Sequence, residues 1–196
     1  MRKIVYTLFI IIASVTTSSA RSLLDTFVST LSAMDNYATE FTVTTTADNY
    51  SNVVTGSYFK QGGNIYVGTF DKEYYIGNDV KYEVNILSKE IIVDLPQIST
   101  HDLFLNPIGY FSSLAKEYKA EDTIYDNAKA VALTPKDKKR TDRVVIVADS
   151  DGLLPYKVIM KDGPQTATIV FEVVRGKAMP TFDRAKYPDF EVIDMR

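Results

Sequence analysis

The sequence predicts an α+β protein: a single large curved antiparallel sheet, an incomplete β-barrel, with helices forming a lid over the concave face. Runs of alternating apolar and polar residues recur between residues 38 and 174, which is typical of strands with one buried face. The connections between these runs are short, so neighbouring strands should pair antiparallel. Helical spacing is found only near residue 23 and between residues 98 and 118.

The first twenty residues predict a signal peptide. Arg2 and Lys3 precede the apolar run "IVYTLFIIIASV", and Ser18-Ser19-Ala20 supplies the small residues that a signal peptidase reads. A membrane anchor is the alternative, but this run is shorter than the roughly 20 residues that span a bilayer. We therefore expect cleavage near Ala20 and a single exported domain over residues 21–196.

The domain is expected to open with one amphipathic helix. In "RSLLDTFVSTLSAMDNY", apolar residues such as Leu24, Phe27 and Leu31 follow helical spacing. Ser22 precedes the first of them and is available as an N-cap.

Strands should follow this helix. The segments are rich in β-branched and aromatic residues and are divided by Gly, Asn, Asp or Gln; they cover residues 38–48, 52–60, 63–70 and a hairpin within 74–96. In this hairpin Val80, Tyr82, Val84 and Ile86 point to one face, because successive side chains of a strand alternate. That face covers either a packed core or a cavity kept open for an apolar ligand.

The segment over residues 98–118 has no strand alternation and predicts two short helices. They should be separated at Asn106-Pro107, since proline disfavours helical backbone at the residue before it. Five further strands are expected after this segment, over residues 122–128, 128–135, 142–150, 155–163 and 166–174. The turn "KDGPQ" joins the last two.

Charge and composition exclude several functions. The chain has 22 basic and 25 acidic residues, and two of the basic ones lie in the predicted signal peptide, so nucleic acid is excluded as a partner. The one dense basic run, "PKDKKR" at 135–140, reads as a solvated hairpin loop. Cysteine is absent, which excludes thiolate catalysis, disulfides and a lipidated cysteine anchor.

The sequence also lacks the motifs of catalysis. His101 is the single histidine, so neither a serine triad nor a histidine-rich metal site can be built in the usual way. We interpret His101 as a polar residue near the start of a helix. "DSDG" at 149–152 reads as a turn, because the spaced ligands of a calcium loop are missing. We predict no enzymatic activity, no cofactor and no metal. The 13 tyrosines and 10 phenylalanines are the informative residues, and core packing is their alternative explanation.

Several motifs taken in order resemble the LolA-like outer-membrane lipoprotein carriers. The hairpin of that family reads D-G-x-x-x-W-x-Y-N, and here Tyr82 stands at the Trp position, Val84 at the Tyr and Asn85 at the Asn. The resemblance continues through Asn106-Pro107, "LTPKDK" at 133–138 and "FDRAKYPDFEVIDMR" at 182–196. Gln61-Gly62-Gly63 stands where better-known carriers have an arginine and a proline.

The resemblance implies a periplasmic carrier that binds lipoprotein acyl chains in a hydrophobic cavity and transfers them from the inner to the outer membrane. The implied partners are lipoproteins, an inner-membrane lipoprotein-releasing transporter and an outer-membrane receptor, and we expect a monomer. Shelter of one chain of about fourteen carbons is worth roughly 11 kcal/mol at about 0.8 kcal/mol per methylene, so a surface patch is too small. The expected lining residues are Tyr66, Tyr82, Val84, Ile86, Ile169 and Phe171, with Phe104, Phe111 and Leu114 on the lid.

Two other functions remain open from sequence. A periplasmic sensor or adaptor could use the same fold to recognise a lipid or a mislocalised protein. A structural protein would instead have a fully packed sheet interior. A charge introduced at Tyr82 or Phe171 separates a ligand cavity, which loses its ligand, from a packed core, which loses stability by several kcal/mol.

Overall fold

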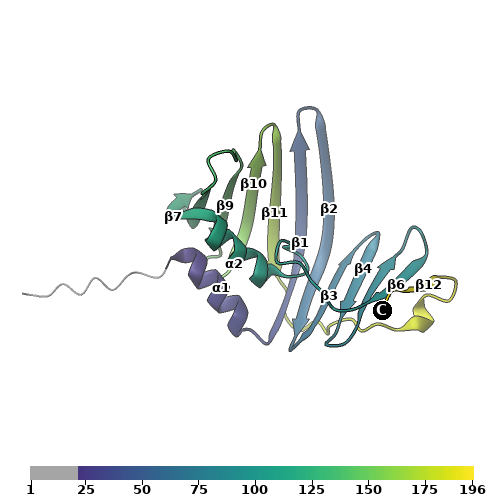
Figure 1. Ribbon diagram of the computed structural model, residues 1–196. Helices are drawn as coiled ribbons and strands as arrows, with labels where there is room; N and C mark the ends of the chain where they lie inside the picture. Colours follow the sequence, from purple (N-terminus) through teal and green to yellow (C-terminus); the bar gives the residue numbers. More distant parts are fainter. Residues whose placement is uncertain (1–21) are drawn as a thin grey trace, which may run out of the picture.

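One open sheet organises the protein. The computed structural model describes residues 22–196, and the predicted signal peptide lies outside the described residues. Twelve strands form a single sheet in the order β12-β6-β5-β4-β3-β2-β1-β11-β10-β9-β8-β7, and two helices cross one of its faces (Figure 1). The sheet ends in two edge strands, so the predicted open curved sheet with helices on one face is confirmed.

The first helix forms as the sequence predicts. α1 (Leu23–Ala33) begins at Ser22, whose side chain accepts a hydrogen bond of 3.1 Å from the N–H of Asp25. This bond satisfies one of the amides that the first helical turn leaves without a partner. The side chains that α1 buries are Leu24, Phe27 and Leu31.

Only one of the two helices predicted over residues 98–118 forms. α2 (Pro107–Glu117) starts after Asn106, whose side chain accepts from the N–H of Gly109 at 2.9 Å. The predicted helix before Asn106 is wrong. The carboxylate of Asp102 accepts from the amides of Phe104 and Leu105 at 2.9 and 2.8 Å, and such local side-chain bonds compete with helix formation.

The first half of the sheet is a run of hairpins. Its strands are β1 (Asn36–Ala47), β2 (Tyr50–Gln61), β3 (Asn64–Thr69), β4 (Lys72–Ile76), β5 (Lys81–Asn85) and β6 (Glu90–Asp94). The strand before residue 80 is separate from β5, because a turn closed by the Gly77 N–H and the Val80 carbonyl at 2.9 Å divides them. Ile86 lies just beyond the end of β5.

The second half begins earlier than expected. Its strands are β7 (Tyr118–Tyr125), β8 (Ala128–Pro135), β9 (Arg143–Ala148), β10 (Pro155–Asp162) and β11 (Gln165–Val173). β7 includes residues 118–121, which the sequence pattern assigned partly to a helix. They are extended because β7 pairs along its whole length with β8, from Tyr118 opposite Pro135 to Tyr125 opposite Ala128.

The two halves join through β1 and β11, which pair antiparallel with Phe41 opposite Phe171. Residues 174–190, called the C-terminal segment from here on, include the short helix η1 (Arg184–Lys186) and lead to β12 (Glu191–Asp194). β12 pairs parallel with β6. This parallel edge strand was not predicted.

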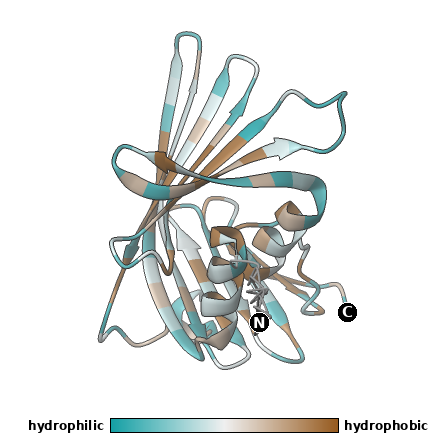
Figure 2. Cartoon of the chain, turned by 90° about the vertical axis from the view of Figure 1, so that its left-hand side faces the viewer, coloured by the Kyte–Doolittle hydropathy of each residue, from teal (hydrophilic) through white to brown (hydrophobic). Residues whose placement is uncertain are grey.

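Apolar side chains gather in two clusters. Figure 2 shows hydrophobic colour where the helices face the sheet, whereas the tips of the long hairpins are paler or hydrophilic. The helix-side cluster contains the buried residues of both helices, and the C-terminal cluster joins β2–β6 to the C-terminal segment. Tyr58 belongs to the first and its neighbour Phe59 to the second, so the clusters lie on opposite faces of the sheet.

Candidate ligand-binding site

The helix-side cluster is the enclosed apolar interior between the helices and the sheet. The helices and the segment before α2 contribute Leu24, Phe27, Leu31, Leu103, Phe111 and Leu114. The strands contribute residues that include Phe41, Tyr58, Val67, Val131, Leu133, Ile146, Val158 and Ile169. All of these side chains are buried, so the interior is shielded from water.

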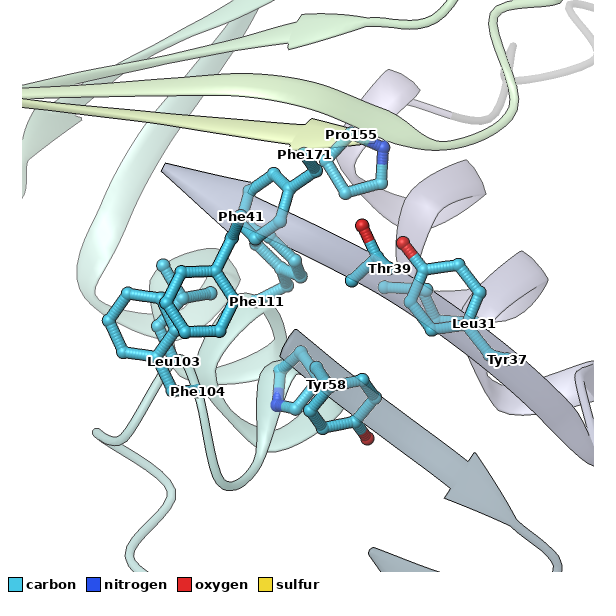
Figure 3. A pocket seen from close by; sticks show the side chains of 11 residues that line it. Leu31, Tyr37, Thr39, Phe41, Tyr58, Leu103, Phe104, Phe111, Pro155 and Phe171 are labelled. Carbon is cyan, nitrogen blue, oxygen red and sulfur yellow. The ribbon is translucent and has the colours of Figure 1, made fainter. Parts of the chain in front are cut away.

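A small cavity remains at one end of this cluster (Figure 3). Its lining residues are Leu31, Tyr37, Thr39, Phe41, Tyr58, Leu103, Phe104, Pro107, Phe111, Pro155 and Phe171. Its volume is about 20 Å³, which is room for about one water molecule and far below the roughly 150 Å³ of an engineered cavity that takes a benzene ring. The interior is therefore closed in this conformation.

Aromatic side chains close the cavity next to the segment that precedes α2. The ring of Phe104 lies 4.6 Å from that of Phe41, and the Phe41 ring covers Gly56 on the neighbouring strand. A Cβ atom at Gly56 would come within 2.3 Å of this ring. Phe104 and Pro107 line the cavity from outside the sheet, so opening the cavity on this side requires the segment before α2 to move.

The other end of α2 is held by the loop between β8 and β9. The Lys136 ammonium group donates to the main-chain oxygens of Ala115 and Lys116 at 3.3 and 2.7 Å. The main-chain N–H of Lys136 donates to the carbonyl of Glu117 at 2.9 Å. Arg140 forms an ion pair of 3.1 Å with the Glu117 carboxylate. The basic run at 135–140, predicted as a solvated loop, therefore also caps the helix, where cations are favourable.

An ion pair and a tyrosine reinforce this contact. Arg140 bonds Asp142 at 2.9 Å and lies over the ring of Tyr118 at 4.8 Å, and the Tyr118 hydroxyl donates to the same carboxylate. The Arg140 hydrogen bond holds the pKa of Asp142 below its ordinary value. Asp142 is therefore ionised at neutral pH, and Arg140 keeps its position beside α2.

The interior itself is uncharged. Within residues 22–196, no charged side chain lines the cavity. Its polar atoms are the hydroxyls of Thr39, Tyr37 and Tyr58, and burial raises the pKa of both tyrosines, so they stay neutral. The Thr39 hydroxyl is satisfied by the Glu172 carbonyl at 2.9 Å. An apolar ligand would meet no unpaired charge here.

Comparison with solved structures bears on the fold. The chain is similar to an uncharacterized conserved protein from Thermus thermophilus, with a TM-score of 0.50 and 11% identity over 88% of this chain and 96% of that protein. A LolA superfamily protein from Nitrosomonas europaea is also similar, with a TM-score of 0.40 and 10% identity over 81% of this chain and 93% of that one. A putative outer membrane lipoprotein-sorting protein domain from Vibrio parahaemolyticus is similar as well, with a TM-score of 0.36 and 10% identity over 79% of this chain and 95% of that one.

The match to the Thermus thermophilus protein shows a shared fold. No protein-family model and no curated protein matches the sequence. At these identities the likeness concerns the fold alone, so the position of each site residue has to be taken from this chain.

Five of the predicted lining residues lie on the helix side of the sheet. Phe104, Phe111 and Phe171 line the cavity, and Leu114 and Ile169 are buried in the cluster around it. They come from the segment before α2, from α2 and from β11, and the fold brings them together on one face of the sheet.

The other four predicted residues lie on the opposite face, and their placement in one cavity with the helices is corrected. Tyr66 and Val84 are buried in the C-terminal cluster, and Tyr82 and Ile86 pack against it. The register explains the difference: Tyr75 lies opposite both Tyr66 and Tyr82, and the side chain of Tyr75 faces the C-terminal segment. The alternation was correct and the assigned face was not.

Several lining residues were not predicted. Tyr37, Thr39 and Phe41 alternate along β1, and their partner Tyr58 lies opposite Thr39 on β2; this alternation was available in the sequence. Leu103 and Pro155 come from a turn and a strand start, and no periodicity marks them.

Other features of the described chain bear on the class of site. Among residues 22–196 there is no group of three or more side chains that could hold a metal ion. Neither helix in this part of the chain is long and apolar enough to cross a membrane.

Proposed function

We propose that the protein is a periplasmic carrier that binds the acyl chains of lipoproteins between α1, α2 and the sheet and transfers them from the inner to the outer membrane. The observation that carries the proposal is the uncharged apolar interior, which is roofed by two helices and a turn segment. Non-directional burial of methylenes suits a ligand without polar groups.

The closed cavity determines how such a carrier would work. At about 20 Å³ the cavity cannot hold an acyl chain, so binding requires separation of the roof from the sheet. Phe104 and Leu103 belong to turns with few main-chain bonds, whereas Lys136 and Arg140 hold the C-terminal end of α2. In the proposal, the segment before α2 moves first and α2 pivots about the held end. The inner-membrane transporter and the outer-membrane receptor would supply and accept the cargo.

A release assay tests this function. The purified protein is mixed with energised spheroplasts of its host, and the supernatant is probed for lipoproteins. Lipoproteins released in a one-to-one complex would support the carrier. If a known carrier from the same cell releases lipoproteins and this protein does not, the carrier function is excluded. A sensor or adaptor of the same fold would then be favoured.

Two matched substitutions distinguish a ligand cavity from a packed core. Phe104→Asp places a charge at the half-buried lining, and Tyr50→Asp places one on a side chain that is 61% exposed at a hairpin tip. For a carrier, Phe104→Asp abolishes release but retains the folded circular dichroism spectrum, and Tyr50→Asp releases normally. If Phe104→Asp instead unfolds the protein, the interior is a structural core.

A further inference from the structure

A second pocket lies on the other face of the sheet, where the C-terminal segment passes over β3, β4 and β5. Its volume is about 250 Å³, compared with about 20 Å³ on the helix side. Tyr75 and Tyr82 line it from the strands, Val80 lines it from the turn before β5, and Met179 and Phe182 line it from the C-terminal segment. It is larger than the roughly 150 Å³ of an engineered cavity that takes a benzene ring.

The walls of this pocket are held in place by contacts of the lining rings with one another and with residues outside the pocket. The rings of Tyr82 and Phe182 stack with centroids 3.9 Å apart and planes 5° from parallel. The Tyr75 hydroxyl lies 2.9 Å from that of Tyr187 and donates to the Glu73 carboxylate at 3.2 Å. These contacts fix two strand rings and the C-terminal segment against each other, so the walls around the pocket are already in place without a ligand.

The lining chemistry selects an uncharged ligand. Among the described residues, those that line the pocket include no Asp, Glu, Lys, Arg or His, so a charged group would lose its hydration without a partner. The lining combines aromatic rings with Val80 and Met179, and the flexible thioether of a methionine adapts to an irregular ligand. Asn64 and Thr181 supply an amide and a hydroxyl group.

We propose that this pocket binds a neutral alkyl chain, with the chain against Val80, Met179 and the stacked rings of Tyr82 and Phe182 and an uncharged polar end near Asn64 and Thr181. This site is separate from the helix-side interior and does not depend on lipoprotein transfer. It gives the protein a second apolar site that is open while the first is closed.

Methionine methyl groups report on the two sites separately. Met34 and Met160 pack against the helix-side cluster, Met179 packs against the C-terminal cluster, and Met195 is 65% exposed. The protein labelled with 13C-methyl methionine is titrated with straight-chain alkanols of increasing length. The Met179 signal should shift and saturate, and the affinity should rise about fourfold for each added methylene until the pocket is full.

A blocking substitution and its control locate the binding. Val80→Trp should fill the pocket and weaken the Met179 response about tenfold or more, whereas Val53→Trp, at a side chain that is 58% exposed, should leave it unchanged. A Met179 shift that Val80→Trp does not weaken overturns the proposal, as does no saturable shift at any chain length.

A shift of Met34 and Met160 without Met179 also overturns it, and places the alkanol in the helix-side interior instead. The release assay is unaffected by any of these results, so the second pocket and the carrier function can fail independently.

Discussion

The side-chain nitrogen of Lys136 lies 2.7 Å from the main-chain oxygen of Lys116, at the last turn of α2. The loop between β8 and β9 thus caps a helix that follows a segment almost free of regular structure. The two ends of α2 are held differently, and this asymmetry directs any opening of the roof to the Pro107 end.

Lys136→Met removes this cap while keeping the length of the side chain. The last carbonyls of α2 lose a cationic donor, and we expect the free energy of unfolding to fall by about 1 kcal/mol. Amide hydrogen exchange should also become faster near Glu117. Lys138→Met in the same exposed loop is the control, and equal effects of the two substitutions would refute the cap.

Asp142→Asn should destabilise the protein in a way that depends on pH. The pKa of Asp142 is below its ordinary value of about 3.9 because Arg140 bonds the carboxylate. The contribution of the ionised group is therefore complete above about pH 4 and is lost as the pH falls through the lower value of the folded state. We expect a loss of about 1 kcal/mol at pH 7 that shrinks on acidification.

Urea unfolding of the wild type and Asp142→Asn across this range measures the difference. The exposed Asp151→Asn is the control, and a difference that stays constant down to pH 2 would contradict the assignment.

Tyr187→Phe should loosen the C-terminal segment. The Tyr187 hydroxyl donates to Glu73 and lies 2.9 Å from the hydroxyl of Tyr75, and burial followed by the bond to Glu73 raises its pKa to about 12. Its contribution is present below about pH 10, where the unfolded side chain is neutral, and is lost as the pH rises through 12.

At pH 7 we expect this substitution to lower the free energy of unfolding by about 1 kcal/mol. In the wild type, the stabilisation by the Tyr187 hydroxyl should disappear as the pH rises through about 12. Urea unfolding of the wild type and Tyr187→Phe at pH 7 and near pH 12 tests this expectation. Tyr156→Phe, at an exposed ring, should change nothing.

Gly56→Ala tests the close approach of Phe41 to β2. The added Cβ would lie 2.3 Å from the Phe41 ring and 2.6 Å from the carbonyl oxygen of Gly68, and neither contact is tolerated without a shift of the sheet. We expect a destabilisation of about 1–3 kcal/mol, as for other overpacked sites. Thermal unfolding measures this destabilisation. Thr55→Ala on the same strand is the control. Gly163→Ala is unsuitable as a control because the φ of 54° at Gly163 adds backbone strain.

The sequence predicted the elements that have a clear period. The helix that Ser22 caps and the alternation of Tyr82 and Val84 follow from spacing alone. The face that Tyr82 occupies did not follow, since the side chains that cover it, such as Phe182, lie in a segment with no period. Tyr118 was assigned to a helix because its neighbours in β7 are exposed on both faces, and an edge strand of this kind carries no alternation to read.

The site was predicted in part for the same reason. Phe111 and Leu114 lie on one face of a helix, and Phe171 is fixed opposite Phe41 by the pairing of β1 with β11. Leu103 approaches the cavity from a turn whose geometry depends on hydrogen bonds such as those of Asp102, and Pro155 approaches it from the first position of β10. Tertiary contacts set their positions, and a local pattern does not encode them.

The order of the strands has a kinetic consequence. Every antiparallel pair joins consecutive strands except β1 with β11, so hairpins from β1 to β6 and from β7 to β11 can each form by closing short loops. We expect the pairing of Phe41 with Phe171 to form after both arrays, because it closes a loop of more than a hundred residues. We therefore expect the helix-side interior to be assembled in the slowest step of folding and to be an exposed apolar surface until then.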